Sequence, residues 1–350
     1  MQIPYGLVRP VLFKLDAERA HRLTLRLLTA MPPSRIADDP PSLRTTVAGL
    51  RFSNPVGIAA GFDKNAEVLN PLLRLGFGFV EAGTVTPLPQ PGNPKPRMFR
   101  LTEDQAVINR LGFNNNGLEQ ALDKFKERAW HRGPRGVTGL NVGANKDSRD
   151  RIADYALSVE HAAPFVDYIT VNISSPNTPG LRTLQSKDEL AELLARVMDA
   201  RGHRKTPIFL KVAPDVTDAD IGDIAVSVVA AGVDGLVVSN TTIERPETLK
   251  SAHAPETGGL SGRPLMARST DVLRAFRQAT VGAVPLIGVG GIASADDAYA
   301  KIRAGASLVQ LYTALVYQGP SLVGAIKTGL AAHLRADGFE RVSQAVGADA

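Results

Sequence analysis

After Pro40 and Pro41 the sequence alternates regularly between two kinds of segment. Eight short apolar runs suit buried strands, and between them apolar residues recur at the spacing of one helix face. The predicted strands span 56–59, 79–82, 137–142, 168–173, 208–212, 235–239, 286–289 and 308–312. The predicted helices span 65–75, 115–130, 149–163, 187–200, 217–231, 268–279, 294–304 and 320–335. Eight strand-then-helix units over roughly 280 residues predict an α/β fold, a (β/α)8 or TIM barrel. A doubly wound sheet is the alternative, but it usually has a switch point and fewer strands.

The richest polar cluster follows the fourth predicted strand. Two amides and two hydroxyls lie within residues 172–177, and Pro176, Pro179 and Gly180 then hold the chain in a turn. Because barrels of this kind place their chemistry at the carboxyl ends of the strands, the cluster favours recognition of a flat, amide-rich molecule. It contains no histidine or cysteine, so Ser175 is the candidate for handling a proton. A polar surface turn is the alternative interpretation.

A lysine interrupts the fifth apolar run. Lys211 would be costly inside a buried strand unless it is paired or faces the mouth of the barrel, so a functional role is the favoured interpretation. Lys64 follows the first strand, and residues 114–116 are three asparagines beyond the second. Taken alone, these two segments suit helix-capping turns.

Glycines follow the seventh predicted strand at 288–292, and residues 312–313 end the eighth, where barrels usually bind phosphate. FMN accounts for this pattern together with Asn141 and Asn172 as amide partners of its ring and Lys211 as a nearby cation. No Rossmann glycine fingerprint follows the first strand, so a tightly held NAD is not expected. The six histidines show no metal-ligand spacing, so no metal is expected.

Composition narrows the chemistry further. The absence of cysteine removes disulfides, iron–sulfur clusters, zinc–thiolate sites and a cysteine base. The net charge of +5 is concentrated in residues 1–35, which carry six basic and two acidic side chains, Arg35 among the basic ones. The remainder is close to neutral, so a nucleic-acid surface is not expected. We expect neither a transmembrane helix nor a signal peptide.

Two short amphipathic helices are predicted before the barrel. Apolar residues recur at helical spacing over 4–15 and again over 17–31, where Asp16 can cap the second helix and Pro32 with Pro33 ends it. Their basic face suits an anionic membrane surface. The alternative, which the helical pattern alone favours, is a pair packed on the main domain with a solvated charged face.

Several long motifs in one order resemble class 2 dihydroorotate dehydrogenase, the quinone-dependent family. They lie at 59–64, 83–87, 108–114, 172–182, 239–242, 258–264 and 287–292, with a further match at 15–22 in the helical extension. Class 1 relatives use a cysteine base and lack that extension, whereas this chain has the extension and no cysteine.

The resemblance implies oxidation of (S)-dihydroorotate to orotate in de novo pyrimidine (UMP) synthesis, with a membrane quinone as acceptor and one FMN per chain. Ser175 would remove the C5 proton while the C6 hydride passes to N5 of FMN. A serine is a poor base at its ordinary pKa, so we expect water exclusion and a relay through Thr178 or a bound water.

The resemblance also assigns residues to three groups. FMN would lie against Ala60, Gly61, Phe62, Asp63, Lys64, Thr84, Asn141, Asn172, Lys211, Ser239, Gly262, Gly291, Tyr312 and Thr313. Dihydroorotate would be held by Lys64, Asn109, Arg110, Leu111, Gly112, Phe113, Asn172, Asn177, Asn240 and Thr241. A quinone tunnel would be lined by His21, Arg100 and Tyr312.

We therefore expect a monomer bound peripherally to the cytoplasmic face of the cell membrane. Residues 1–40 would form the membrane-facing tunnel helices, 41–337 the FMN-binding barrel, and 338–350 a polar, mobile tail. One rival is another FMN barrel oxidoreductase, acting on a 2-hydroxy acid or another pyrimidine. A 2-hydroxy acid would call for a catalytic histidine, and no histidine stands at a strand exit. The other is a membrane-docked barrel that binds flavin or nucleotide without turnover.

Overall fold

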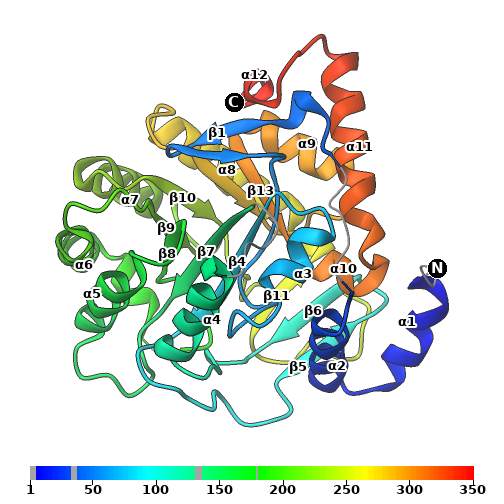
Figure 1. Cartoon of the computed structure of the whole chain (residues 1–350), viewed down its shortest axis with the longest axis horizontal. Helices are drawn as coiled ribbons and strands as arrows, with labels where there is room; N and C mark the ends of the chain where they lie inside the picture. The colour runs from blue at the N-terminus through cyan, green and yellow to red at the C-terminus, as the bar shows by residue number, and fades with distance from the viewer. Residues whose placement is uncertain (1–4, 33–37, 131–135, 179) are drawn as a thin grey trace.

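The computed structural model describes residues 5–32, 38–130, 136–178 and 180–350. Expectations that fall on Pro33, Arg35 and Pro179 lie outside these ranges. Eight parallel strands close into a barrel, surrounded by helices (Figure 1). In chain order the strands are β3 (Val56–Ile58), β4 (Phe79–Val85), β7 (Val137–Val142), β8 (Tyr168–Asn172), β9 (Ile208–Val212), β10 (Gly235–Val238), β12 (Leu286–Val289) and β13 (Ala306–Leu311). The predicted barrel is confirmed.

The outer helices follow the strands as predicted. They are α3 (Leu69–Arg74), α4 (Leu118–Trp130), α5 (Arg151–Ala162), α6 (Lys187–Arg201), α7 (Asp218–Ala231), α8 (Met266–Ala279), α9 (Ala295–Arg303) and α11 (Ser321–Ala336). Local chemistry fixes their ends. In α7, for example, Thr217 and Asp220 form a reciprocal capping box, and Gly232 ends the helix in the left-handed conformation at φ 66°.

Large side chains close the amino-terminal end of the barrel. Phe79, Tyr168 and Phe209 fill the interior, and the backbone of Gly139 lies so close that an added Cβ would come within 2.2 Å of the Tyr168 ring. The hairpin of β1 (Thr45–Val47) and β2 (Leu50–Phe52) packs beneath them. Only the carboxyl ends of the strands are therefore left for a site.

A small sheet, absent from the sequence prediction, stands at the open end of the barrel. It pairs β5 (Met98–Leu101), β6 (Ala106–Asn109) and β11 (Gly259–Gly262) in the order β11-β6-β5. The strands β6 and β11 are far apart in sequence, and each is short, so no local periodicity announces their pairing. The remaining short helices are α10 (Thr313–Gln318), α12 (Val342–Ala345) and the 3-10 turns η1 (Pro41–Leu43), η2 (Arg182–Gln185) and η3 (Arg263–Leu265).

The carboxyl-terminal residues are anchored on the barrel, whereas a mobile tail was expected. Helix α12 buries Val342 and Ala345 completely. Beyond it, the carboxylate of Asp349 pairs with Arg303 at 2.6 Å, and its backbone N–H donates to the Arg303 carbonyl. Two buried apolar side chains and a paired carboxylate hold this segment on the barrel.

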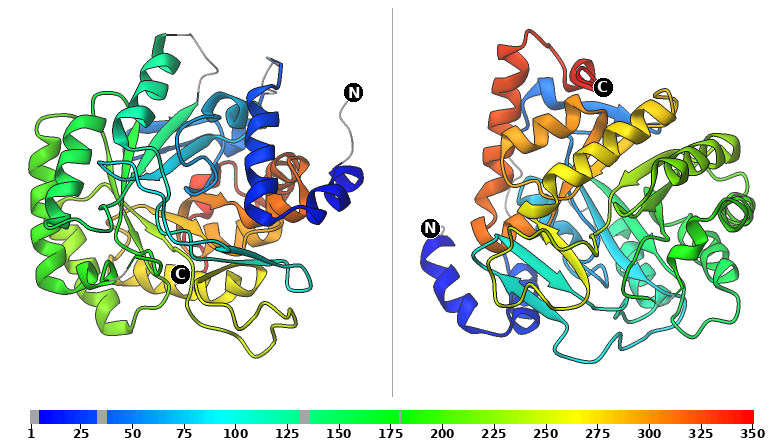
Figure 2. Two further views of the ribbon diagram at one scale, coloured as in Figure 1. Left: turned by 90° about the horizontal axis from the view of Figure 1, so that it is seen from below. Right: turned by 180° about the vertical axis from the view of Figure 1, so that it is seen from behind.

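The predicted amino-terminal pair is present as α1 (Tyr5–Lys14) and α2 (Ala17–Thr29). The carboxylate of Asp16 accepts the backbone N–H of Arg19 at 3.0 Å, which confirms the predicted cap. The pair lies beside the small sheet and α10, apart from the main ring of helices (Figures 1 and 2). Among the described residues, no helix combines the length and apolarity needed to span a bilayer.

Candidate active site

A cavity of about 440 Å³ opens at the carboxyl ends of the barrel strands and continues between α1, α2 and the barrel. It is lined by all but three of the predicted site residues. These are His21, Ala60, Gly61, Phe62, Lys64, Thr84, Arg100, Asn109, Leu111, Gly112, Phe113, Asn172, Ser175, Asn177, Lys211, Ser239, Asn240, Thr241, Gly262, Gly291, Tyr312 and Thr313. Its size falls within the range of small-molecule and cofactor sites.

The three exceptions support the site from outside the cavity lining. The Asp63 carboxylate accepts two backbone N–H groups at 2.8 Å, from Glu67 and Val68, so it shapes the turn after β3. Burial raises the pKa of Asp63 to about 6. The Arg110 guanidinium pairs with Glu256 at 2.7 Å, so its side chain is engaged away from the cavity.

Asn141, the third exception, belongs to a network of amides beneath the cavity. Its Oδ1 accepts from the Thr84 hydroxyl at 2.5 Å and from Nδ2 of Asn172 at 3.1 Å. Nδ2 of Asn240 donates to the Ser174 hydroxyl at 3.0 Å. Since these residues come from β4, β7 and β8 and from the loops that follow β8 and β10, their mutual bonds hold the amides in fixed orientations before any ligand arrives.

A buried glutamate anchors this network, and the sequence analysis missed it. Glu81 on β4 is completely buried and accepts hydrogen bonds from Asn141 at 2.8 Å, Tyr168 at 3.1 Å and Gln310 at 2.7 Å. It interrupts an apolar run just as Lys211 does, so the same signal could have found it. Burial lowers the pKa of Lys211, and the charge of Glu81 opposes that shift.

Ser175 lies at the cavity on the loop that follows β8. It is only 5% exposed, and its Oγ accepts the backbone N–H of Asn177 at 3.2 Å. Within the described ranges no hydrogen bond joins Ser175 to Thr178, so the expected relay through Thr178 is not formed directly in this structure. The low exposure matches the expected exclusion of water.

One ion pair ties the Ser175 loop to its neighbours. The Arg182 guanidinium pairs with Asp215 at 2.8 Å and donates to the carbonyls of Ser174 and Thr241, each at 3.2 Å. Asp215 in turn accepts from the Thr242 hydroxyl. Three loops at the barrel mouth are therefore fixed to one another close to Ser175.

Lys64 stands at the cavity after β3. Its ammonium donates to Oδ1 of Asn114 at 2.6 Å, and burial together with the charge of Arg97 lowers its pKa to about 7. A group of this kind gains charge when an anion binds beside it.

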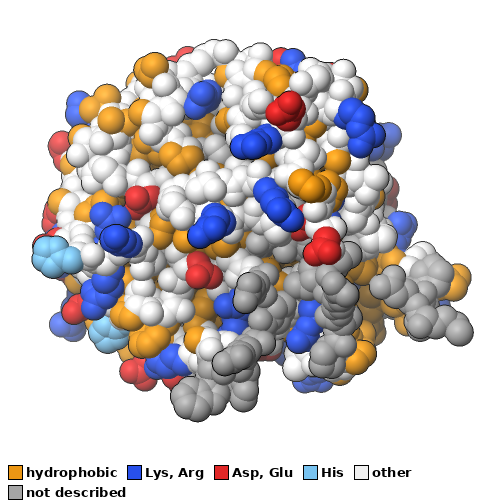
Figure 3. Space-filling view, turned by 45° about the horizontal axis from the view of Figure 1, so that its top comes forward, with side chains coloured by type: hydrophobic (Ala, Val, Ile, Leu, Met, Phe, Trp, Pro, Cys, Tyr) orange, Lys and Arg blue, Asp and Glu red, His pale blue; other side chains and the backbone are white. Residues whose placement is uncertain are grey.

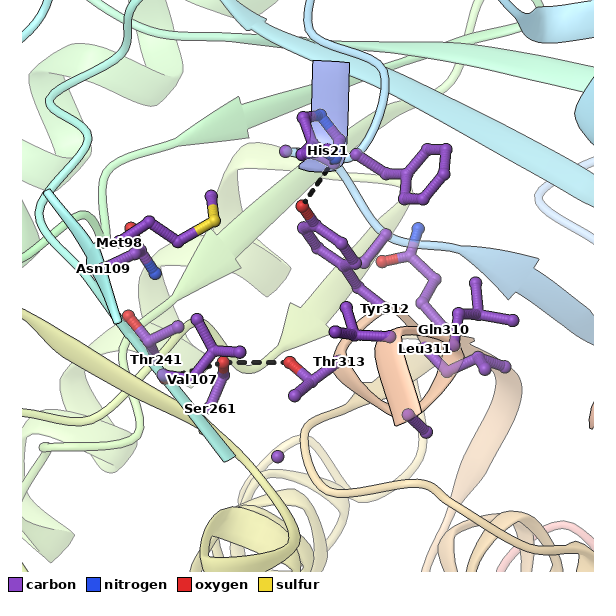
Figure 4. A pocket seen from close by; sticks show the side chains of 18 of the residues that line it. His21, Met98, Val107, Asn109, Thr241, Ser261, Gln310, Leu311, Tyr312 and Thr313 are labelled. Atoms are coloured by element: carbon purple, nitrogen blue, oxygen red, sulfur yellow. Dashed lines mark hydrogen bonds between the residues drawn. The ribbon is translucent and has the colours of Figure 1, made fainter. Parts of the chain in front are cut away.

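Three aromatic residues line the cavity next to α2. Figure 4 shows His21 from α2 facing Tyr312, with 3.4 Å between Nδ1 and the phenol oxygen. The Phe62 ring lies 5.3 Å from each of these two rings, centroid to centroid. Burial and the charge of Lys64 lower the pKa of His21 to about 4, so this passage is uncharged at neutral pH.

Arg100, the third predicted tunnel residue, also lines the cavity. Its guanidinium donates to carbonyls at the end of α1, those of Leu12 at 3.2 Å and Phe13 at 3.3 Å. It also donates to the carbonyl of Leu15, just after the helix. It therefore fixes the end of α1 against the small sheet.

Three of the residues that line the cavity suit an anionic group. Gly290, Gly291 and Thr313 lie in its lining, and none of their backbone N–H groups has a hydrogen-bond acceptor among the described residues. Donors without acceptors, a buried lysine and orienting amides fit the phosphate and ring of FMN. Within the same described ranges, no group of three acidic or histidine side chains could hold a metal ion.

Comparison with known proteins agrees with this geometry. The family model of dihydroorotate dehydrogenase matches residues 42–334. A protein from Parvibaculum lavamentivorans, named dihydroorotate dehydrogenase (quinone), is 58% identical over 99% of this chain and 98% of its own length. One of the same name from Novosphingobium aromaticivorans is 54% identical over 99% of both chains.

A solved structure shares the whole architecture. The DHODH of Eimeria tenella, crystallised with ferulenol, superimposes with a TM-score of 0.91 at 42% identity, covering 97% of this chain and 98% of its own. The chain belongs to the dihydroorotate dehydrogenase family, in its quinone-dependent class.

Proposed function

We propose that this chain oxidises (S)-dihydroorotate to orotate and passes the electrons to a quinone through bound FMN, a step of de novo pyrimidine synthesis. The observation that carries the proposal is a single cavity that joins two unlike regions. One holds Ser175, the amides and Lys64, and the other lies between the apolar faces of α1 and α2. A polar substrate and a lipid-soluble acceptor therefore each find a region of matching chemistry in the same cavity.

Different side chains transfer the proton, bind the cyclic imide and bind the carboxylate of the substrate. Ser175 takes the C5 proton, and its loop is held by the Arg182–Asp215 pair. Asn109, Asn177 and Asn240 offer both donors and acceptors to the cyclic imide. FMN bound in this cavity would supply the redox chemistry, with N5 as the hydride acceptor. Lys64 meets the substrate carboxylate.

The charge of Lys64 predicts a pH dependence for orotate binding. Below its pKa of about 7 in the free site the lysine is protonated and attracts the carboxylate, so affinity is highest there. As pH rises through 7 the free site loses this proton, and affinity should fall up to about tenfold for each pH unit. Titration of the flavin absorption with orotate between about pH 6 and pH 8.5 measures this. Lys64→Met should bind orotate weakly, with an affinity that does not vary with pH over this range. If the variant kept the pH dependence of the wild-type protein, Lys64 would be removed from this role.

The helix pair supports peripheral attachment to a membrane. Leu7, Val11 and Leu27 are 71%, 64% and 56% exposed on these two helices. Arg19, Arg22 and Arg26 are exposed on the second helix and can meet anionic headgroups. On the face shown in Figure 3, by contrast, charges of both signs lie scattered over uncharged surface. Wild-type protein should cosediment with vesicles containing anionic lipid, and protein lacking residues 1–40 should stay in the supernatant.

The attachment is proposed for the cytoplasmic face of the cell membrane, with the enzyme acting as a monomer. All predicted site residues within one chain reach one cavity or its support, which is consistent with that state. In this proposal residues 1–40 attach the protein to the membrane and form the quinone tunnel. Residues 41–337 form the FMN-binding barrel, and 338–350 are a polar end packed on α9. Sedimentation velocity in detergent tests the monomer.

A turnover assay tests the function as a whole. Purified protein with FMN should reduce a ubiquinone analogue when dihydroorotate is supplied, and should not do so with a 2-hydroxy acid. Activity with the acid alone would favour the rival FMN oxidoreductase. A protein that retains flavin and turns over neither substrate would favour the non-catalytic binding protein.

A further inference from the structure

A second buried lysine lies behind the cavity, and the proposed mechanism does not use it. Lys301 on α9 is completely buried, although it is not part of the cavity lining. Its ammonium donates to the hydroxyl of Ser269 on α8 at 2.6 Å, and Ser269 is also completely buried. A buried cation is costly, so its position calls for a physical reason.

The lysine determines which way the hydroxyl of Ser269 donates its own hydrogen bond. A lysine ammonium can only donate, so the Ser269 oxygen accepts from it and its single proton is left for a carbonyl. The Gly290 carbonyl lies 2.9 Å away, and the Met266 carbonyl 3.2 Å. The Gly290 carbonyl, which is the closer of the two, is therefore drawn into the protein, toward α8 and away from the cavity.

The geometry of the peptide then turns a donor toward the cavity. The bond between Gly290 and Gly291 is trans, so the Gly290 carbonyl and the Gly291 N–H point in opposite directions. Gly291 lines the cavity and its N–H has no acceptor among the described residues. Both glycines have positive φ, 110° and 83°, and a Cβ on Gly291 would come within 2.4 Å of the Met266 backbone. The loop is tightly packed in this one arrangement.

No carboxylate neutralises Lys301 by direct contact in the described structure. Asp271 and Asp297 are its acidic neighbours. Asp271 pairs with Arg274 at 3.1 Å, and Asp297 accepts the Ala293 N–H at 2.9 Å. Burial lowers the pKa of Lys301 to about 7, a shift that an anion in front of the loop would reverse.

We propose that Lys301 is a positioning residue for the cofactor phosphate, acting through Ser269 to present the Gly291 N–H and adding a buried positive charge behind it. The inference rests on the proposed binding of FMN. It assigns Lys301 to the phosphate alone, because Lys211 and the amides are the residues that would hold the flavin ring, and Lys301 contacts none of them. Riboflavin, which has the same ring and no phosphate, separates the two parts of the cofactor.

The test compares FMN with riboflavin on the flavin-free protein. In Lys301→Met, which keeps the length and loses the charge, FMN affinity should fall at least tenfold while riboflavin affinity stays within twofold of wild type. Ser269→Ala should show a smaller loss, again confined to FMN. Lys327→Met is the matched control, because Lys327 on the outer helix α11 donates to the carboxylate of Asp39 at 2.6 Å and not to Ser269 or the 290–291 loop.

Two results would overturn the inference. Unchanged FMN affinity in Lys301→Met, or an equal loss for FMN and riboflavin, would leave the lysine a purely structural role. If Lys301→Met does not fold, as judged by circular dichroism, Ser269→Ala decides by the same ratio. A wild-type protein that binds no FMN would instead defeat the proposed function itself.

Discussion

Ser175→Ala is expected to slow reduction of the bound flavin by dihydroorotate by about 100-fold to 10,000-fold at neutral pH. Ser175 is the only hydroxyl of its loop that is both in the cavity lining and close to the amide network among the described residues. Removing it deletes the acceptor for the C5 proton and leaves the amides in place. Binding of FMN and of orotate should therefore change little. Stopped-flow absorbance of the flavin band, with both ligands titrated separately, measures the two effects.

A matched variant guards against a general effect of losing a serine. Ser186 ends the same loop, is exposed, and makes no side-chain capping bond at the start of α6. Ser186→Ala should reduce the flavin at the wild-type rate. Near-normal reduction in Ser175→Ala would remove Ser175 from proton transfer. A loss of orotate binding as large as the loss of rate would point to a binding role instead.

Deleting residues 1–40 is expected to abolish reoxidation by a long-chain quinone and to spare reduction by dihydroorotate. The helices supply one wall of the cavity through Ala20, His21 and Thr24, and none of the residues assigned to dihydroorotate comes from them. A small water-soluble acceptor reaches the flavin without this wall, so its turnover should persist. The two half-reactions, followed separately by flavin absorbance, measure the difference.

A point variant makes the same test without removing a packed element. Ala20 is buried in the cavity wall, so Ala20→Trp should fill the passage and slow the long-chain quinone at least tenfold. Thr29→Trp, on an exposed position of the same helix, is its control and should have little effect. Unimpaired quinone turnover in the deletion and in Ala20→Trp would contradict the tunnel.

The barrel could be predicted because its signals are local. Caps such as Thr217 and apolar runs such as β7 and β9 fix their elements within a few residues. The pairing of β6 with β11 is not local, and neither sequence has a period that reveals its partner. The small sheet at the mouth was therefore missed.

Some residues of the site could likewise be recognised from the sequence, and others only from the structure. Lys211 stood out because a charged residue in a buried strand is unusual. Glu81 also interrupts an apolar strand, but the sequence analysis did not single it out. The family motif placed Arg110 in the right segment, but a motif does not give the direction of a side chain, and Arg110 turns to Glu256. Lys301 lies on the buried face of α9, where only packing against α8 shows that the charge is enclosed.

Anaerobic mixing of the purified protein with dihydroorotate, followed by a ubiquinone analogue, tests the central claim most directly. The proposed function predicts that the visible flavin band bleaches on the first addition and recovers on the second. Bleaching without recovery would keep the substrate and contradict the quinone. A band that stays oxidised in the presence of dihydroorotate would contradict the assignment of Ser175, Lys64 and the amides to this reaction.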